Sequence, residues 1–115
     1  MTVTIYGIKN CDTMKKARKW LADQGVEAVF HDYKSSGIDA EHLERWCAAA
    51  GWETVLNRAG TTFRKLDEAE KQDLDPAKAI RLMLAQPSMI KRPVVEADDR
   101  VLVGFKPELY AQFFG

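Results

Sequence analysis

Short β-rich runs at both ends of the chain predict strands, and the segment between the first two runs predicts an amphipathic helix. Residues 2–6 favour a strand, and residues 26–33 alternate between apolar and polar positions. Residues 11–24 repeat apolar side chains at helical spacing, and Gly25 is suited to end that helix. This order of strand, helix and strand predicts a right-handed βαβ unit.

The C-terminal segment predicts two more strands and a final helix. Residues 93–96 and 101–104 are β-branched runs, and Asp98 and Asp99 between them are suited to a hairpin turn. Pro107 then marks the first turn of a helix, where its missing N–H has no hydrogen bond to lose. This end of the chain is therefore expected to form a ββα unit.

The middle of the chain, about residues 36–86, has a helical pattern. Asp39 is expected to cap a helix that ends at Gly51, and Asp75-Pro76 to start another that Pro87 stops. A βαβ unit, a helical insertion and a ββα unit, in this order, predict an α/β protein with a thioredoxin-like fold and a mixed four-stranded sheet.

Length and charge narrow the function further. The 115 residues predict one domain over residues 1–115, and seventeen basic residues balance seventeen acidic ones. Such a balance argues against nucleic acid and anionic membranes as partners, and no apolar run is long enough for a membrane span. The two cysteines predict no disulfide scaffold, and His31 and His42 lack metal-ligand spacing with them. We expect a cytoplasmic monomer without metal.

Cys11 is the main candidate for chemistry, because it lies where the first strand gives way to the first helix. Free N–H groups and the positive end of the helix dipole favour the nucleophilic thiolate there. Lys9 would lower the pKa of the thiol further, and Asn10 is a candidate N-cap, whereas the Asp12 carboxylate opposes the thiolate. The alternative is that Cys11 is a small buried apolar residue.

The remaining candidate residues bear on two questions: whether a second thiol is available, and which side chains supply positive charge. Met14 stands where a Cys-x-x-Cys motif would carry its second cysteine, and Cys47 is expected in the core or, alternatively, as a resolving thiol. Arg92 precedes Pro93 at a strand start. A cis peptide costs little free energy before a proline, and the Arg92 guanidinium is suited to bind a carboxylate. Two more cations near predicted helix starts are anion-binding candidates or ordinary surface charges: Arg58 and Lys106.

The chain resembles the ArsC-like group of arsenate reductases, Spx transcription regulators and YffB-type proteins, and is most similar to the YffB type. Cys-Asp-Thr-Met-Lys-Lys-Ala at residues 11–17 and Lys-Arg-Pro-Val at residues 91–94 carry the resemblance, with residues 57–58 and 103–105. In the arsenate reductases the corresponding cysteine attacks arsenate and three arginines hold the oxyanion. By resemblance these are Cys11, Arg58 and Arg92, while the third falls on Lys106 or is absent. Asp12 and Met14 replace small residues of the arsenate-reductase loop.

The resemblance and the residues together predict an enzyme, a glutathione-dependent thiol–disulfide oxidoreductase with Cys11 as the single nucleophile. Glutathione is expected as a co-substrate, held near Arg92 and Pro93, with no bound cofactor. Lys9 would stabilise the thiolate, and Arg58 or Lys106 would hold an anionic part of a small or protein substrate. The alternatives are an arsenate reductase that uses glutathione and glutaredoxin, and a non-enzymatic, Spx-like regulator that binds RNA polymerase.

Overall fold

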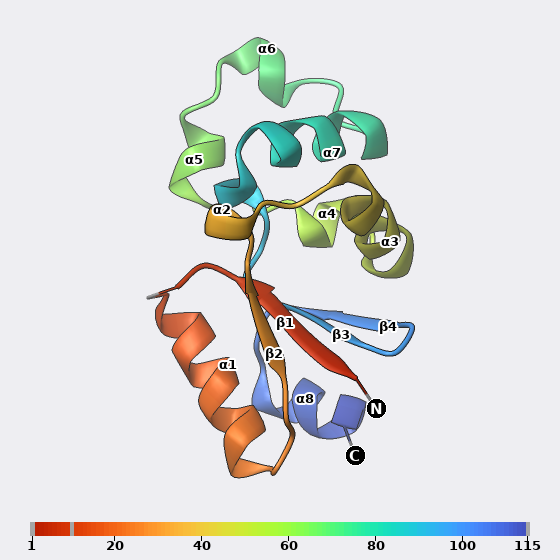
Figure 1. Cartoon of the computed structure of the whole chain (residues 1–115). Coiled ribbons are helices and arrows are strands. Elements are labelled where there is room, and N and C mark those ends of the chain that lie inside the picture. The colour runs from red at the N-terminus through yellow and green to blue at the C-terminus, as the bar shows by residue number, and fades with distance from the viewer. Residues whose placement is uncertain (1, 10, 115) are drawn as a thin grey trace. The chain divides into compact units, whose positions relative to one another are not determined.

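Residues 2–9 and 11–114 are described by the computed structural model, and the chain folds into two units. The first unit joins residues 1–36 to residues 92–115, and the second is residues 37–91. In Figure 1 the first unit contains the sheet and the second contains helices only. The sequence prediction that they form a single domain stays a prediction.

The first unit is built on a mixed four-stranded sheet in the order β2-β1-β3-β4. Its strands are β1 (Val3–Gly7), β2 (Val29–Asp32), β3 (Val94–Ala97) and β4 (Arg100–Val103). β1 is parallel to β2 and antiparallel to β3, which is antiparallel to β4. Helix α1 (Asp12–Asp23) connects β1 to β2, and α8 (Pro107–Phe114) follows β4. This is a thioredoxin-like fold, which confirms the fold predicted from the sequence.

The core of the first unit is shared by β1, β3, α1 and α8. Its buried members are Val3, Ile5, Met14, Ala17, Leu21, Val95, Ala97 and Tyr110. Trp20 packs edge-on against Tyr110, with ring centroids 5.5 Å apart. The Tyr110 hydroxyl donates a hydrogen bond to the Gly104 carbonyl at 2.8 Å, so this buried polar group is satisfied. The helical periodicity of residues 11–24 therefore marks the face of α1 that meets this core.

The second strand is shorter than the alternation of residues 26–33 predicts. Val26 lies beyond α1 but is hydrogen-bonded to its last turn, because its N–H donates to the Leu21 carbonyl at 2.9 Å. At its other end the Asp32 carboxylate accepts backbone N–H groups of the one-turn helix α2 (Tyr33–Ser36). A carboxylate that binds its own following N–H groups turns the chain out of the strand. Tyr33 therefore begins a helix instead of ending a strand.

The predicted hairpin and final helix are confirmed. β3 and β4 are joined through Asp98 and Asp99, with Ala97 paired to Arg100 across the turn. Asp98 has a positive φ of 57°, which aspartate tolerates better than most residues. Pro107 is the first residue of α8.

The second unit is a helical segment. Its elements are α3 (Ala40–Ala50), α4 (Trp52–Val55), α5 (Thr61–Arg64), α6 (Glu68–Lys71), α7 (Pro76–Ala85) and the 3₁₀ turn η1 (Pro87–Met89). The two longer helices, α3 and α7, are those that the sequence predicts. Both carry buried apolar side chains, among them Leu43 and Trp46 of α3 and Leu82 and Met83 of α7.

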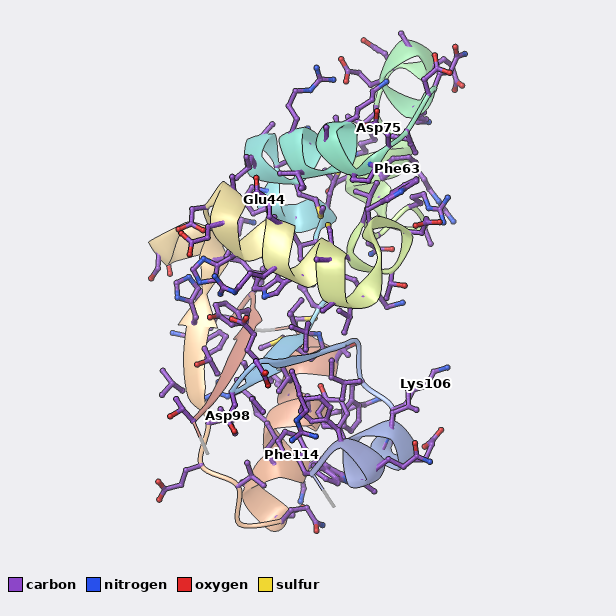
Figure 2. The ribbon with its side chains drawn as sticks, turned by 90° about the vertical axis from the view of Figure 1, so that its right-hand side faces the viewer. Glu44, Phe63, Asp75, Asp98, Lys106 and Phe114 are labelled. Atoms are coloured by element: carbon purple, nitrogen blue, oxygen red, sulfur yellow. The ribbon has the colours of Figure 1, made fainter. Side chains whose placement is uncertain are left out.

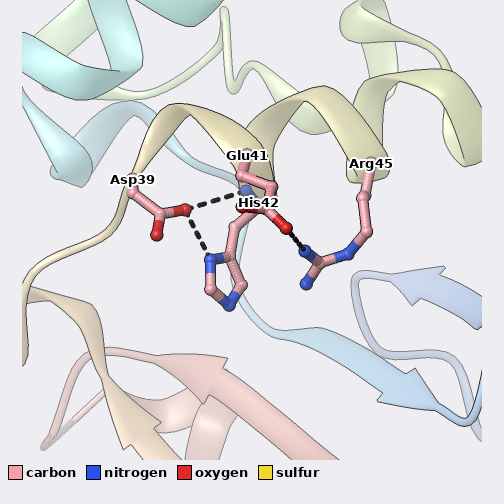
Figure 3. A network of polar contacts seen from close by, with 4 residues as sticks. All are labelled: Asp39, Glu41, His42 and Arg45. Atoms are coloured by element: carbon pink, nitrogen blue, oxygen red, sulfur yellow. Dashed lines mark hydrogen bonds and ion pairs between the residues drawn. The ribbon is translucent and has the colours of Figure 1, made fainter.

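Aspartate caps begin both of these helices, as predicted. Figure 3 shows the start of α3, where the Asp39 carboxylate accepts the backbone N–H of His42 at 2.9 Å and lies 2.6 Å from its Nδ1. These contacts hold the pKa of Asp39 below its usual range, the backbone hydrogen bond being the largest cause. Asp75 caps α7 in the same way by accepting the Lys78 N–H at 2.7 Å. Gly51 ends α3 with a φ of 89°, a conformation that favours glycine.

Candidate functional site

Three segments of the first unit leave the sheet at the same end. Gly7, the last residue of β1, pairs with Asp32, the last residue of β2. Val94, the first residue of β3, pairs with Tyr6. The segment that leads into α1, the start of α2 and the segment before β3 therefore begin at neighbouring positions of the sheet. These segments carry Cys11, Tyr33 and Arg92.

Cys11 is itself the N-cap of α1. Its backbone is extended, with φ −91° and ψ 132°, while its carbonyl already accepts the Lys15 N–H at 3.0 Å. The prediction of Asn10 as the N-cap is therefore wrong, and Asn10 lies outside the described residues. Since an N-cap side chain faces the free N–H groups of the first turn, the cap position suits a thiolate. The side chain is partly exposed, and it also packs against the apolar core.

Hydrogen-bond donors around the Cys11 sulfur favour its thiolate form. Burial raises the pKa of the thiol, but the backbone N–H groups of Met14 and Thr13 and the Arg92 side chain outweigh it. The pKa therefore lies below its usual value. Arg92 contributes both a hydrogen bond and its positive charge. The Cys11 side chain makes no regular capping hydrogen bond to α1.

Arg92 and Pro93 directly precede β3. The Arg92–Pro93 peptide is cis, and Pro93 is buried with its carbonyl accepting the Gly104 N–H at 2.8 Å. Arg92 acts on the pKa of both Cys11 and Tyr33, lowering each through its positive charge and a side-chain hydrogen bond. Of the predicted site residues, Cys11 and Arg92 are thus brought together.

Tyr33 is a member of this cluster that sequence reasoning missed. Its side chain is fully buried, and burial raises the pKa of its hydroxyl strongly, while the neighbouring Arg92 partly opposes the rise. The alternation of residues 26–33 places Tyr33 in a strand, where its position marks it only as a core residue. In the sequence, the only sign of a role in the site is the place of this tyrosine directly after the second strand of the βαβ unit.

The two lysines predicted for the site do not share this environment. Lys9 is exposed, and its backbone N–H donates to the Asp32 carboxylate at 3.4 Å. Lys106 is also exposed, and its side chain extends away from the sheet and from α8 in Figure 2. The interactions that lower the Cys11 pKa come from other groups. The roles of Lys9 and Lys106 stay predictions.

Arg58 belongs to the second unit and lines a surface hollow there. Its guanidinium lies 5.5 Å from the centre of the Trp52 ring. Lys91, which sequence reasoning did not select, is brought to the same hollow because its N–H donates to the Val55 carbonyl at 2.8 Å. The hollow has a volume of about 350 Å³ and is lined by Glu53, Thr54, Leu56, Asn57, Arg58, Ala59 and Lys91. Its two cations make it suitable for an anionic group.

The other sulfur-containing residues explain why the site has one thiol. Met14, at the position of a second Cys-x-x-Cys cysteine, is buried in the core of the first unit. Cys47 is half-buried on α3, and burial raises the pKa of its thiol. Both cysteines are free. The partly exposed Cys11 and the half-buried Cys47 thus differ in their readiness to ionise.

Residues 2–9 and 11–114 also bear on metal-dependent and membrane-spanning classes of function. Within these ranges, no three acidic, histidine or cysteine side chains group in a way that could hold a metal ion. Among the same residues, no helix has the length and apolar character that a membrane crossing requires.

Comparisons with known proteins identify the relatives of the chain. Residues 6–113 match the ArsC family. An uncharacterised protein of Haemophilus influenzae (strain ATCC 51907 / DSM 11121 / KW20 / Rd) is 43% identical over 112 residues, covering 97% of this chain and 98% of that protein. A solved structure described as YffB (PA3664) protein is 72% identical with a TM-score of 0.94, over 96% of this chain and 97% of that one. A solved arsenate reductase (ArsC) related protein from Brucella melitensis is 61% identical with a TM-score of 0.79, over 99% and 95%.

Proposed function

The chain belongs to the ArsC family, and on that premise we propose that it is a thiol–disulfide oxidoreductase with Cys11 as nucleophile and glutathione as reductant. The environment of the Cys11 sulfur carries the proposal. The thiol is partly exposed, and its pKa is lowered by helix N–H groups and by Arg92. A thiolate in such a setting is typical of a reactive cysteine.

The proposed reaction has two thiol–disulfide exchanges. The Cys11 thiolate attacks the glutathione sulfur of a substrate–glutathione disulfide, a new S–S bond forms, and the substrate leaves as a thiolate that takes a proton from water. A second glutathione thiolate then attacks the glutathione sulfur bound to Cys11, which releases the Cys11 thiolate and glutathione disulfide. In total, the mixed disulfide is reduced to a thiol while two glutathione units end as one disulfide.

The same groups serve both steps. The donors that stabilise the Cys11 thiolate before attack also make Cys11 a good leaving group in the second exchange, because a sulfur of low pKa leaves faster. Arg92 and Pro93 are the proposed contacts for a glutathione carboxylate and backbone, and Lys9, on the loop between β1 and Cys11, is proposed to stabilise the thiolate. The cations Arg58 and Lys106 are the proposed contacts for an anionic part of the substrate.

A pair of serine variants tests the proposal. Cys11→Ser is expected to lower the glutathione-dependent reduction of a glutathionylated peptide at least about 100-fold, because a serine hydroxyl does not ionise at neutral pH. Cys47→Ser is the matched control and is expected to retain more than about half of the activity, since its thiol is held protonated by burial.

Retention of activity in Cys11→Ser would refute the proposal. Turnover of arsenate by the wild-type chain with glutathione and glutaredoxin, at concentrations where the peptide is not reduced, would favour an oxyanion reductase instead.

A further inference from the structure

We propose that Tyr33 is a positioning residue of the thiol site, and that its hydroxyl holds the Arg92 guanidinium in the orientation that faces the Cys11 sulfur. The inference rests on the proposed role of Cys11 as a nucleophile. It assigns to Tyr33 an effect on sulfur chemistry that is exerted through Arg92.

The register of the sheet brings Tyr33 and Arg92 together. Tyr33 directly follows Asp32, which ends β2, and Arg92 stands two residues before Val94, which begins β3. Both strands flank β1, the strand that leads to Cys11. The two side chains therefore approach the same end of β1 from its two sides. A contact between them spans that end of the sheet.

The burial of Tyr33 makes its hydroxyl dependent on a polar partner. The side chain has 0% exposure, and a buried hydroxyl without a hydrogen bond is costly. Arg92 lowers the pKa of both the Tyr33 hydroxyl and the Cys11 thiol through its charge and a side-chain hydrogen bond, so it is the polar partner proposed for both groups. Because a guanidinium is planar with donors in a fixed fork, an acceptor on one part of the fork sets where the other donors point. Tyr33 thus limits the rotation of Arg92.

Tyrosine suits this role because it accepts a hydrogen bond without cancelling the charge of Arg92. Burial keeps the Tyr33 hydroxyl protonated far above neutral pH. A carboxylate at this place would also fix Arg92, but its negative charge would oppose the thiolate. The Asp32 carboxylate, the nearest acidic group on β2, is engaged by backbone N–H groups of α2 and of Lys9.

Other charged groups near Cys11 lie on different segments. Asp12 is on the first turn of α1, and Lys9 lies on the loop before it. Neither is among the groups that lower the Cys11 pKa. Arg92 is a charged group that lowers the Cys11 pKa, so a change in its orientation is expected to appear in the titration of Cys11.

The test is the pH dependence of Cys11 alkylation by iodoacetamide, with Cys47→Ser as the common background. Tyr33→Phe is expected to raise the midpoint of the profile by roughly 0.5 pH unit, because Arg92 loses its acceptor. Tyr110→Phe is the matched control: it removes the hydroxyl of another fully buried tyrosine, whose hydrogen bond goes to the Gly104 carbonyl. It is expected to leave the midpoint unchanged.

A double variant separates positioning from a general structural effect. In an Arg92→Met background, Tyr33→Phe is expected to move the midpoint no further. An equal shift there, or no shift in Tyr33→Phe alone, would overturn the proposal. Should Tyr33→Phe not fold, the Arg92 Nε–H signal of the wild-type chain decides: slow exchange with water supports a fixed guanidinium, and fast exchange refutes it.

The same profiles distinguish failure of this inference from failure of the proposed function. A wild-type midpoint at the value of a free thiol would remove the proposed function and this inference with it. A low wild-type midpoint that Tyr33→Phe leaves unchanged would overturn the role of Tyr33 alone.

Discussion

The two cysteines show how one side chain acquires opposite properties from its surroundings. Cys11 is partly buried, which disfavours its thiolate, yet the N–H groups of α1 and the Arg92 guanidinium reverse that effect. Cys47 lies on α3, where burial acts without such donors and raises the pKa of its thiol. Reactivity at the residue scale is therefore decided by the donors within reach of the sulfur.

A direct consequence is that the two thiols should react at different rates. Limited iodoacetamide at pH 7 is expected to label Cys11 at least about ten times faster than Cys47, because the thiolate is the reacting form and its fraction rises as the pKa falls. Mass spectrometry of tryptic peptides measures both rates in one sample. Because Cys11 ionises at a lower pH than Cys47, raising the pH towards 10 mainly increases the thiolate fraction of Cys47. The ratio of the two labelling rates should therefore narrow. Equal rates at pH 7 would contradict this difference in ionisation.

The sequence alone singles out Cys11 as a candidate, but it does not show which side chains lie beside the sulfur. A cysteine between a predicted strand and a predicted helix is a local pattern, and such patterns survive folding. The contact of Cys11 with Arg92 depends on strand pairing between distant segments, so only the resemblance and the proline pattern pointed to it. Tyr33 was missed because its role depends on the side chain that it meets. Asn10 was chosen as the cap from residue preference alone, which places a cap only to within a residue or two.

At the scale of elements, the junction of β1 and α1 depends on a glycine packed against a methionine. A Cβ atom on Gly7 would lie 2.1 Å from Sδ and 2.7 Å from Cε of Met14. Met14 is only 2% exposed, so its side chain has little room to move away. The missing side chain of Gly7 thus allows Met14 to fill the core directly below the turn that carries Cys11.

This packing predicts a strong coupling between the two positions. Gly7→Ala is expected to lower the free energy of unfolding by about 1–3 kcal/mol through overpacking. Met14→Ala is expected to lower it by about 2–5 kcal/mol through the cavity that it leaves. In the double variant the new methyl group occupies part of that cavity, so the combined loss should be at least about 1 kcal/mol smaller than the sum. Urea denaturation of the four proteins measures the coupling, and additive losses would exclude it.

Elements with strong end signals were predicted well, whereas three of the one-turn helices were not. Asp39 and Asp75 each combine a capping carboxylate with a long apolar face, so both α3 and α7 were found. Helices α2, α4 and α6 are four residues long, too short for a periodic pattern, and depend on local hydrogen bonds such as those to Asp32. The end of β2 was misplaced for the same reason.

At the scale of the whole molecule, the second unit is inserted in the sequence between the two segments of the first unit. The first unit needs both of its segments, because β1 pairs with β3 in the middle of the sheet. The second unit, residues 37–91, is the connection between those segments. If it were unfolded, the sheet would have to close a flexible loop of that length, which costs on the order of 3–4 kcal/mol. When the second unit is folded, the sheet does not have to close a fully flexible loop.

Loop closure therefore predicts that the two units lose stability together. Asp75→Ala removes the cap of α7 and is expected to cost about 1 kcal/mol. That loss should appear equally in the hydrogen-exchange protection of α7 and of β1, measured at increasing urea concentration. Asp67→Ala is the matched control, because Asp67 precedes α6 without a side-chain capping hydrogen bond, and it should change neither. Loss of protection in α7 with β1 unchanged would mean that the second unit unfolds independently, and the single domain predicted from the sequence would then be wrong.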